Sequence, residues 1–373
     1  MKKDKIQVIN LNKYERIDTS NLLNFGNKFV TNGTDNSFFY DLDDRYYGSP
    51  TNAAVINSYV NYIMGKGLIA KSGIDQETLD RILDYNDLKN IILELKKTGN
   101  SPIQVVYAKI PDKKKVAKLY SLQTKQVAIK NQEDLSENIR EYWFSYDWRL
   151  RTKFRPYEVP AFSYGKDKQS EIFYLKNNWQ EPLFSLPDWV SGIQFAQMEE
   201  EISNYVINHI KNNFSAGKIV NIYQGEAEDE EAEEEADRLI KQRLSGSGNA
   251  GNVIVSFNKN PDEKTEVDTI EIQDAYQQFQ FVSEYSKEQI FTAHSVTSPT
   301  LFGADSQTGF SSDSEQMKTA LKTLYRSQIN PIRRKITTAL EMILNESYPE
   351  VQLEFQDFDE LIIEEENKTI KDE

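Results

Sequence analysis

The stretch that most constrains the fold is residues 274–331, because it predicts two long helices joined by a small polar loop. In the first helix, apolar residues recur at intervals of three, four and their multiples, which places them on one face. They are Ala275, Phe279, Val282, Ile290 and Ala293. Asp274 can cap the start of this helix, and Pro299 keeps the residue before it out of the helical conformation. The pattern therefore predicts a helix over 274–294.

The second helix is expected to begin at Asp313 or Ser314, either of which can cap it. Its apolar face comprises Met317, Leu321, Leu324, Tyr325, Ile329, Ile336, Leu340 and Ile343. Pro331 is expected to interrupt this helix, since proline disrupts a helix interior. Residues 303–312, between the two helices, are small, polar and glycine-bearing. Such a loop is either a plain connector or a functional element, and the pattern alone leaves both open.

Residues 38–186 predict an α+β body with antiparallel strands. Ser49 and Pro50 begin a helix that ends at Gly65 and Gly67, and residues 75–99 form a further helix closed by Gly99. β-branched and aromatic runs predict strands at 103–108, 116–122, 126–129, 141–146 and 171–175. A last strand over 351–355 could rejoin this body. Residues 1–37 are mixed and polar, and are expected either to lack structure or to pack on a neighbour.

Residues 187–273 predict a long helix followed by a small segment with two strands. Over 187–215, apolar residues repeat every four positions and Pro187 and Asp188 fit the start. Strands over 218–223 and 253–257 flank the acidic run 226–237, which is either a helix with a solvated first half or an unstructured insert. The run lacks the alternation of a calcium loop. The Ser/Gly loop over 245–252 lacks a phosphate-binding motif.

Charge and rare residues narrow the class of function. The 373 residues carry a net charge of −15, which argues against a protein that grips nucleic acid but not against one that lets DNA slide past. There is no cysteine, and His209 and His294 both fall in predicted helices, so we expect no zinc site and no Ser-His-Asp triad. No apolar run is long enough to span a membrane, and a signal peptide is not expected. We predict neither an enzyme nor a bound cofactor or metal.

Three groups of residues resemble the portal proteins of tailed bacteriophages. The first is QIFTAHSVTSPTLFG at 289–303, followed by the polar loop and a helix containing INPIRRKI. The second is an aromatic motif before a Ser-Pro helix that ends in a glycine pair. The third is the order of an AGK strand, an acidic helix, a NAGN strand and a long helix. Together they cover residues 38–356.

The resemblance implies a portal-like α+β fold with a wing, two stem helices, a small α/β clip and a spine helix. It divides the chain into wing 1–186, stem helix 187–215, clip 216–273, stem helix 274–294, tunnel loop 295–313 and wing 314–373. The last part holds the spine helix, the final strand and a short tail.

The resemblance also implies where partners are contacted. The tunnel loop would line the DNA channel with Asp305, Ser306, Gln307, Thr308, Gly309, Phe310 and Ser311. The clip would dock partners through Glu226, Asp229, Glu230 and Glu234. Lys211 and Lys287 would offer phosphate contacts, or they are ordinary surface lysines.

The family resemblance implies a ring of about twelve subunits at one vertex of the virion capsid, assembled in the host cytoplasm. Its expected partners are double-stranded DNA passing without sequence readout, the terminase large subunit, the major capsid and scaffold proteins, and the head-tail adaptor. No membrane contact is expected. The alternative is a monomeric α+β adaptor or binding module of the virion that has no DNA channel.

Overall fold

The structure is a computed structural model that describes residues 21–22, 28–33, 36–110, 114–131, 139–150, 152–165, 169–178, 183–211, 218–223, 253–258, 275–303 and 314–358. Its internal contacts fall into two units. One contains Gln194–Glu288, and the other contains Ile17–Ile193 together with Gln289–Glu373. Each unit is described by itself below, as unit 1 and unit 2 respectively.

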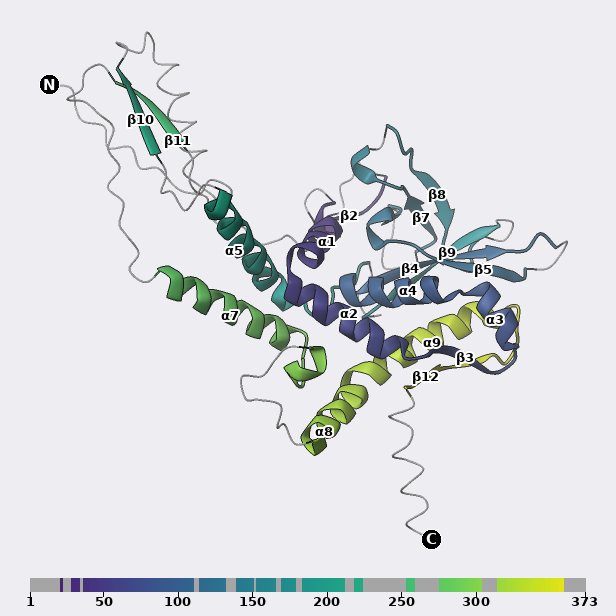
Figure 1. The fold of residues 1–373 in the computed structure, drawn as a ribbon. Coiled ribbons are helices and arrows are strands. Elements are labelled where there is room, and N and C mark those ends of the chain that lie inside the picture. The colour runs from purple at the N-terminus through teal and green to yellow at the C-terminus, as the bar shows by residue number, and fades with distance from the viewer. Residues whose placement is uncertain are drawn as a thin grey trace. The chain divides into compact units, whose positions relative to one another are not determined.

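The helices of unit 2 are α1 Phe38–Gly48, α2 Pro50–Met64, α3 Gln76–Ile82, α4 Tyr85–Thr98, α8 Ser314–Leu324 and α9 Asn330–Asn345 (Figure 1). The expected start of α2 is confirmed, since the Ser49 side chain accepts a hydrogen bond from the Asn52 amide at 3.2 Å. Gly99 ends α4 in the left-handed conformation, as expected. Helix α1 was not predicted, because its aromatic residues were interpreted only as a motif.

The prediction of a single helix over 75–99 is wrong, because the structure has two helices there, α3 and α4. Leu83 adopts an extended conformation, and the Asp84 carboxylate then caps α4 by accepting from the Asp87 amide at 2.9 Å. An aspartate at this position satisfies a free N–H of a new first turn, so it starts a helix rather than continuing one. Both pieces still bury the expected apolar positions, including Leu79 and Leu88.

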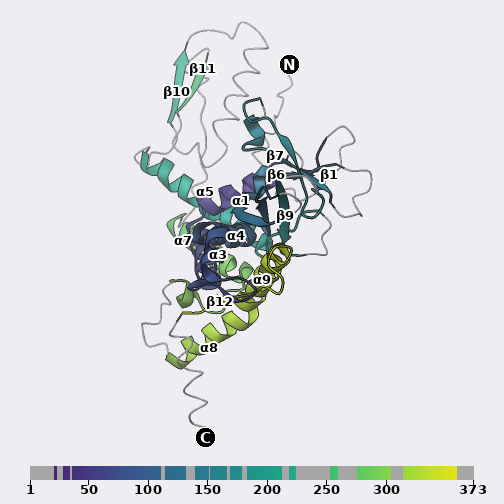
Figure 2. The ribbon, with the colours of Figure 1, turned by 90° about the vertical axis from the view of Figure 1, so that its right-hand side faces the viewer.

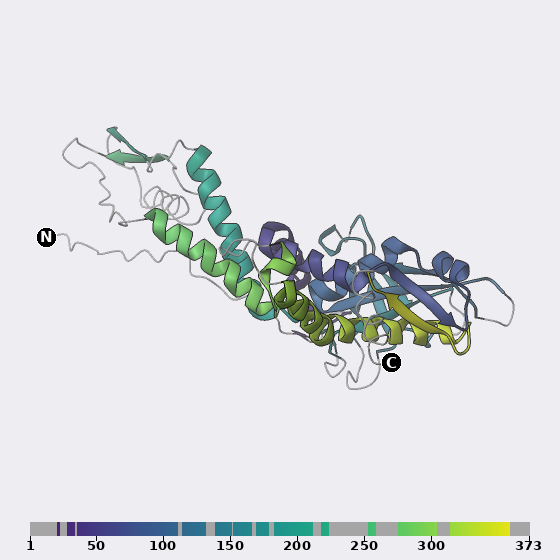
Figure 3. The ribbon, with the colours of Figure 1, turned by 60° about the horizontal axis from the view of Figure 1, so that its bottom comes forward.

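The strands of unit 2 pair antiparallel throughout. They are β1 Asn21–Leu22, β2 Thr31–Asn32, β3 Gly67–Ser72, β4 Asn100–Tyr107, β5 Val116–Ser121, β6 Val127–Ile129, β7 Glu141–Phe144, β8 Tyr157–Pro160, β9 Ser170–Lys176 and β12 Gln352–Gln356. The sheet orders are β5-β4-β9, β6-β7-β8, β12-β3 and β1-β2. The last strand does rejoin the body, since β12 pairs with β3 (Figure 3). Strands β1, β2, β3 and β8 were not predicted.

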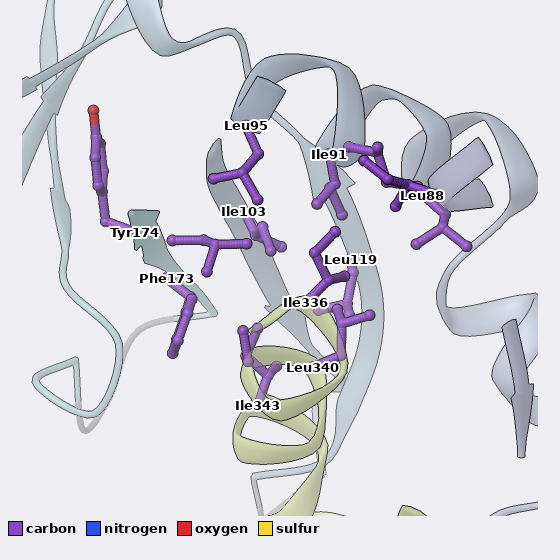
Figure 4. Close-up of a cluster of buried hydrophobic side chains, with 14 of the residues drawn as sticks. Leu88, Ile91, Leu95, Ile103, Leu119, Phe173, Tyr174, Ile336, Leu340 and Ile343 are labelled. Atoms are coloured by element: carbon purple, nitrogen blue, oxygen red, sulfur yellow. The ribbon is translucent and has the colours of Figure 1, made fainter. Parts of the chain in front are cut away.

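The core of unit 2 lies between helices α4 and α9 and the sheet β5-β4-β9. Figure 4 shows side chains from all of these elements meeting in one cluster. Among them are Ile91 of α4, Ile103 of β4, Leu119 of β5 and Leu340 of α9, each fully buried. The spacing of three and four residues on the helices and of two on the strands turns these residues to the same side. The α+β prediction is confirmed.

The predicted interruption of the spine helix takes the form of a π-helical segment, Tyr325–Ile329, between α8 and α9. Pro331 is the second residue of α9, and Ile329 and Asn330 before it are already in the helical conformation. The helix was expected to break at Pro331, but it continues through this residue. Instead, the wider π turn lies just before the proline and changes the register between the faces of α8 and α9.

Unit 1 contains two long helices and a pair of strands. The helix predicted over 187–215 begins later than expected, with a 3₁₀ turn at Val190–Gly192 followed by α5 Ile193–Lys211. The helix predicted over 274–294 is confirmed as α7 Ala275–Ala293. Strands β10 Lys218–Tyr223 and β11 Val253–Asn258 pair in parallel. A parallel pair requires a connection that crosses back over the sheet, and the connecting residues 224–252 lie outside the described ones.

Candidate functional site

The two long helices pack against each other within unit 1. The rings of Phe195 and Tyr285 lie 5.8 Å apart in an edge-to-face arrangement, and those of Tyr205 and Phe279 lie 4.8 Å apart. Because the residue number rises along α5 as it falls along α7, the helices run antiparallel. The two long helices therefore lie side by side, while their role as stem helices stays a prediction.

Pairing leaves several apolar side chains of this unit in water. Toward the end of α5, Val206, Ile207 and Ile210 are 42%, 47% and 55% exposed. On α7, Phe281 is 66% exposed and stacks on Tyr285 at a centroid distance of 6.0 Å. Single exposed apolar residues are ordinary, but successive ones on one helix leave a surface that gains free energy when another surface covers it.

The two lysines proposed from the sequence lie toward opposite ends of the helix pair. Lys211 is the last residue of α5, beyond the contact made by Tyr205. Lys287 of α7 lies beyond the contact made by Tyr285. Both side chains are exposed. The structure therefore does not combine Lys211 and Lys287 into one site, and their role as phosphate contacts stays a prediction.

The other proposed site residues lie outside the described part of the chain. These are Asp305, Ser306, Gln307, Thr308, Gly309, Phe310 and Ser311 of the tunnel loop, and Glu226, Asp229, Glu230 and Glu234 of the acidic run. What the structure does describe is the first part of the predicted tunnel loop, up to Gly303, and the start of α8 at Ser314.

Within unit 2, two tyrosines of α2 hold the segment of residues 294–302. The Tyr59 hydroxyl donates to the His294 carbonyl at 2.8 Å, and the Tyr62 hydroxyl donates to the Leu301 carbonyl at 2.6 Å. Between them, the 3₁₀ turn Pro299–Phe302 inserts Phe302, whose ring lies 5.0 Å from that of Tyr59. These contacts hold residues 294–302 in one place, directly before the part of the chain, 304–313, that the structure does not describe.

The segment before α5 is fixed at the same place in unit 2. The Lys96 ammonium pairs with the Asp188 carboxylate at 2.6 Å and lies 4.0 Å from the centre of the Tyr59 ring. The Trp189 indole N–H donates to the Lys96 carbonyl at 3.1 Å, and its ring stacks on His294 at 5.5 Å. We call these five residues, Tyr59, Lys96, Asp188, Trp189 and His294, the anchor cluster.

The chain therefore leaves unit 2 and returns to it at neighbouring points. A Cβ added at Gly192 would lie 2.7 Å from the Ala293 Cβ, closer than side-chain carbons normally approach. Glycine at position 192 permits this approach because it has no side chain. The close contact brings the residue just before α5 against the last residue of α7.

His294 has a structural role in the anchor cluster. Its Nε2 lies 2.7 Å from the side-chain oxygen of Asn52. The side-chain nitrogen of Asn52 donates to the Arg45 carbonyl. The Asn52 oxygen is therefore an acceptor, and the Nε2 proton of His294 donates to it. Burial lowers the pKa of His294 well below its ordinary value, and the charge of Lys96 lowers it further. At 2% exposed, the ring of His294 stacks on those of Tyr59 and Trp189 and contributes to packing.

The described residues contain no group of three or more His, Asp or Glu side chains arranged to hold a metal ion. Over the same part of the chain, no helix is both long and apolar enough to cross a membrane. Sequence reasoning missed the importance of Tyr59, Lys96 and Trp189. Trp189 gave a signal, since a tryptophan directly before a long amphipathic helix is well placed to fix its start.

The structure is a mixed α+β fold that carries a pair of long antiparallel helices. The model of the phage portal protein family matches residues 84–367, about three quarters of the chain. The chain therefore belongs to the phage portal protein family, as the sequence resemblance predicted.

Solved structures with a similar fold come from gene transfer agent (GTA) particles. One is a chain from the neck of an empty GTA particle computed with C6 symmetry, with a TM-score of 0.58 and 15% identity over 89% of this chain and 87% of that chain. Another is from the neck of a native GTA particle computed with C12 symmetry, with a TM-score of 0.59 and 14% identity over 89% and 88%. A third is from the virion of a native GTA particle, with a TM-score of 0.57 and 15% identity. Among curated protein sequences, none matches this chain.

Proposed function

We propose that this chain is the subunit of a portal ring at a single capsid vertex, through which double-stranded DNA is packaged and ejected. The observation that carries the proposal is the helix pair α5 and α7, which leaves Val206, Ile207, Ile210 and Phe281 exposed. In a ring, each subunit covers such a surface on its neighbour. The neck structures computed with C6 and C12 symmetry support a ring of about twelve copies.

In this ring, residues 305–311 line the narrowest part of the channel. The fixed base formed by Tyr59 and Tyr62 supports this role, because a loop that touches moving DNA must transmit force to the rest of the subunit. Its small side chains contact DNA without reading the sequence. Lys211 and Lys287 add weak phosphate contacts.

The partners of the ring follow from the same proposal. The acidic residues Glu226, Asp229, Glu230 and Glu234 dock the terminase large subunit during packaging and the head-tail adaptor afterwards. The wing contacts the major capsid and scaffold proteins, and assembly takes place in the host cytoplasm before the ring becomes part of the virion. The subunit itself hydrolyses nothing, since the chemistry of packaging belongs to the terminase.

The first experiment measures the mass of the purified full chain by light scattering, with negative-stain images of the same peak. We expect rings with a central hole and a mass about twelve times the 43.2 kDa of one subunit. A chain that remains monomeric at high concentration and with capsid partners present contradicts the proposal. That result favours the alternative, a monomeric α+β adaptor of the virion.

A second experiment deletes residues 305–311 to separate the ring from the channel. We expect the variant to form rings of the same mass but to fail in packaging DNA or retaining it. Loss of ring assembly instead assigns the loop to subunit contacts and contradicts its role in the channel. A variant that packages and retains DNA normally also contradicts that role.

A further inference from the structure

The outer side of helix α9 carries a groove. On the inner side of the same helix, Ile336, Leu340 and Ile343 point into the core of unit 2, as Figure 4 shows. The groove has a volume of about 480 Å³. Its described lining comes from α9 alone and comprises Pro331, Arg334, Lys335, Thr338, Ala339 and Met342. We call this surface the α9 groove, and Figure 2 shows the helix that carries it at the edge of unit 2.

Part of the lining is apolar and exposed. Met342 is 54% exposed, and Pro331 is exposed beside it in the lining. Covering such side chains with another apolar surface gains free energy in proportion to the area removed from water. Methionine is also flexible enough to adapt to an irregular partner. The groove therefore favours an occupant that carries apolar side chains.

The charge of the groove is positive. Arg334 and Lys335 are the charged residues of the described lining, and within that part of the chain no carboxylate pairs with the exposed Arg334. The Lys335 ammonium donates to the backbone and side-chain oxygens of Asn177, the latter at 2.7 Å, and both oxygens are neutral. Burial lowers the pKa of Lys335, and the charge of Asp188 offsets only part of this effect. A carboxylate in the groove would stabilise both cations.

The described chain ends close to the groove. Strand β12 ends at Gln356, and the next residue, Asp357, pairs with the Arg333 guanidinium in the first turn of α9. Arg333 is itself held, since it donates to the Ile63 carbonyl at 2.9 Å and to the Tyr62 carbonyl at 3.0 Å. The residues that follow Phe358 therefore start from a fixed point, one residue along α9 from Arg334.

The following residues are enough to reach the groove. Arg333 lies near the core side of α9 and the groove lies on the outer side, so the chain must pass around the helix. Half the circumference of a helix about 10–12 Å across is about 17 Å. An extended chain advances about 3.3 Å per residue, so the stretch 358–363 spans about 20 Å.

The sequence of this part of the chain is complementary to the groove. Residues 359–366 read DELIIEEE, in which an apolar run is enclosed by acids. The apolar residues are Leu361, Ile362 and Ile363. The segment therefore combines apolar side chains and carboxylates, which are the two kinds of group that the groove lacks partners for.

We propose that residues 359–366 of the same chain occupy the α9 groove. Leu361, Ile362 and Ile363 cover Met342, and the glutamates that follow them face Arg334. The same segment from a second copy is the less suitable occupant, because a segment that starts beside the groove has a far higher effective concentration there. The proposal goes beyond the proposed function and holds for a single chain.

The test uses the absence of cysteine from the sequence. The full-length variant Met342→Cys/Ile362→Cys carries two thiols, which form a disulfide only when their Cα atoms come within about 7 Å of each other. The purified protein is oxidised with glutathione disulfide. Labelling of the remaining thiols and non-reducing gel electrophoresis follow the reaction over time. We expect a disulfide within one chain.

The matched control is Lys66→Cys/Ile362→Cys. Position 66 is exposed and lies beside the last strand, since the Lys66 amide donates to the Gln356 carbonyl at 2.9 Å. A segment that moves freely would meet this position at least as often as position 342. Because docking raises the effective concentration at the groove, we expect the Met342→Cys variant to react at least about fivefold faster than the control. Equal rates, or a faster reaction in the control, overturn the proposal.

The gel also identifies the occupant. Disulfides that join two chains migrate at twice the mass of one, and their predominance in the Met342→Cys variant overturns the proposal in favour of a second copy. A disulfide within one chain supports it.

Charge reversal tests the electrostatic part of the proposal. Adding Arg334→Glu to the Met342→Cys/Ile362→Cys variant should slow the reaction, because the new carboxylate repels the glutamates of the segment. Further addition of Glu364→Lys/Glu365→Lys/Glu366→Lys should restore the rate. A rate that Arg334→Glu leaves unchanged overturns the proposal, since the charges then play no part in holding the segment.

The mass of the same samples keeps this proposal separate from the proposed function. A monomeric chain that forms the disulfide at position 342 contradicts the ring and supports occupation of the groove. Rings whose subunits react no faster at position 342 than at position 66 support the ring and overturn occupation of the groove.

Discussion

The anchor cluster buries its apolar side chains, whereas the last turns of helix α5 leave theirs exposed. In the anchor cluster, Trp189 is 1% exposed and its indole N–H has a partner. On α5, Ile207 and Ile210 are about half exposed within a single chain. The first region is buried within the chain, whereas the second leaves apolar surface in water. Under the proposed function, this exposed surface of unit 1 is where a neighbouring subunit packs.

The largest expected effect comes from Trp189→Ala. Removing a fully buried aromatic side chain leaves a cavity and costs about 3–5 kcal/mol of unfolding free energy. It also leaves the Lys96 carbonyl without its indole partner. Urea denaturation followed by circular dichroism measures the change, with Tyr47→Ala as the control because Tyr47 is 78% exposed. Equal losses of unfolding free energy in the two variants would contradict the inference that the anchor cluster stabilises unit 2.

A somewhat smaller loss is expected from Lys97→Met, in the buried charge cluster beside the core. Lys97 pairs with Asp43 and Glu94 at 2.7 Å each, and all three side chains are buried. Burial alone lowers the pKa of Lys97, but the two carboxylates outweigh it and raise the pKa above its ordinary value. Leaving Glu94 buried without its cation costs about 3 kcal/mol, while Lys125 still pairs with Asp43.

The control for this change is Lys71→Met. Its pair with Glu354 is more than half exposed, so the expected cost is below about 1 kcal/mol. Denaturation of both variants under the same conditions provides the comparison. A loss from Lys97→Met as small as that from Lys71→Met would show that the buried cluster does not stabilise unit 2.

An intermediate effect is expected from pH, through His294. Because the folded state lowers the pKa of His294, the histidine gains its proton more readily when unfolded. Its contribution is complete above the ordinary pKa of about 6.5 and is lost as the pH falls below that value, by about 1.4 kcal/mol per pH unit. Denaturation at pH 7 and pH 5.5 should show this loss in the wild-type chain. In His294→Gln the difference should shrink, and an equal pH dependence in both proteins would contradict the inference.

The smallest effect on stability is expected from Ile207→Ser/Ile210→Ser. Both side chains are exposed, so the unfolding free energy should change by less than about 0.5 kcal/mol. The same change should nevertheless prevent ring assembly, as measured by light scattering. The control Tyr120→Ser also alters an exposed apolar residue, 43% accessible, but in unit 2. If the α5 variant formed normal rings, the proposal that Ile207 and Ile210 contact a neighbouring subunit would be contradicted.

Local features of the fold could be predicted from the sequence, and long-range ones could not. Ser49 and Pro50 marked the start of α2, and the spacing from Phe279 to Ala293 marked α7, because capping and periodicity are properties of neighbouring residues. The break at Leu83 was missed because the apolar pattern continues across it, and Asp84 is recognised as a cap only once the break is known. Strand β3 was missed because its partner, β12, lies far along the chain.

The candidate site was predictable in kind but not in its supporting residues. The order of motifs indicated the family, and the helix pair follows from it. The anchor cluster joins residues from four distant parts of the sequence, so no local pattern could have assembled it: Tyr59, Lys96, Asp188 with Trp189, and His294.

The pairing of β3 with β12 means that β3 must wait for its partner strand while the chain is synthesised. About 280 residues separate the two strands, so β3 is made long before its partner exists. At 5–20 residues per second, a ribosome needs roughly 15 to 60 s to add the intervening chain. During that interval β3 presents an unpaired edge, the kind of surface that joins wrongly with other nascent chains. The strand therefore stays open to wrong pairing until almost the whole chain has been made.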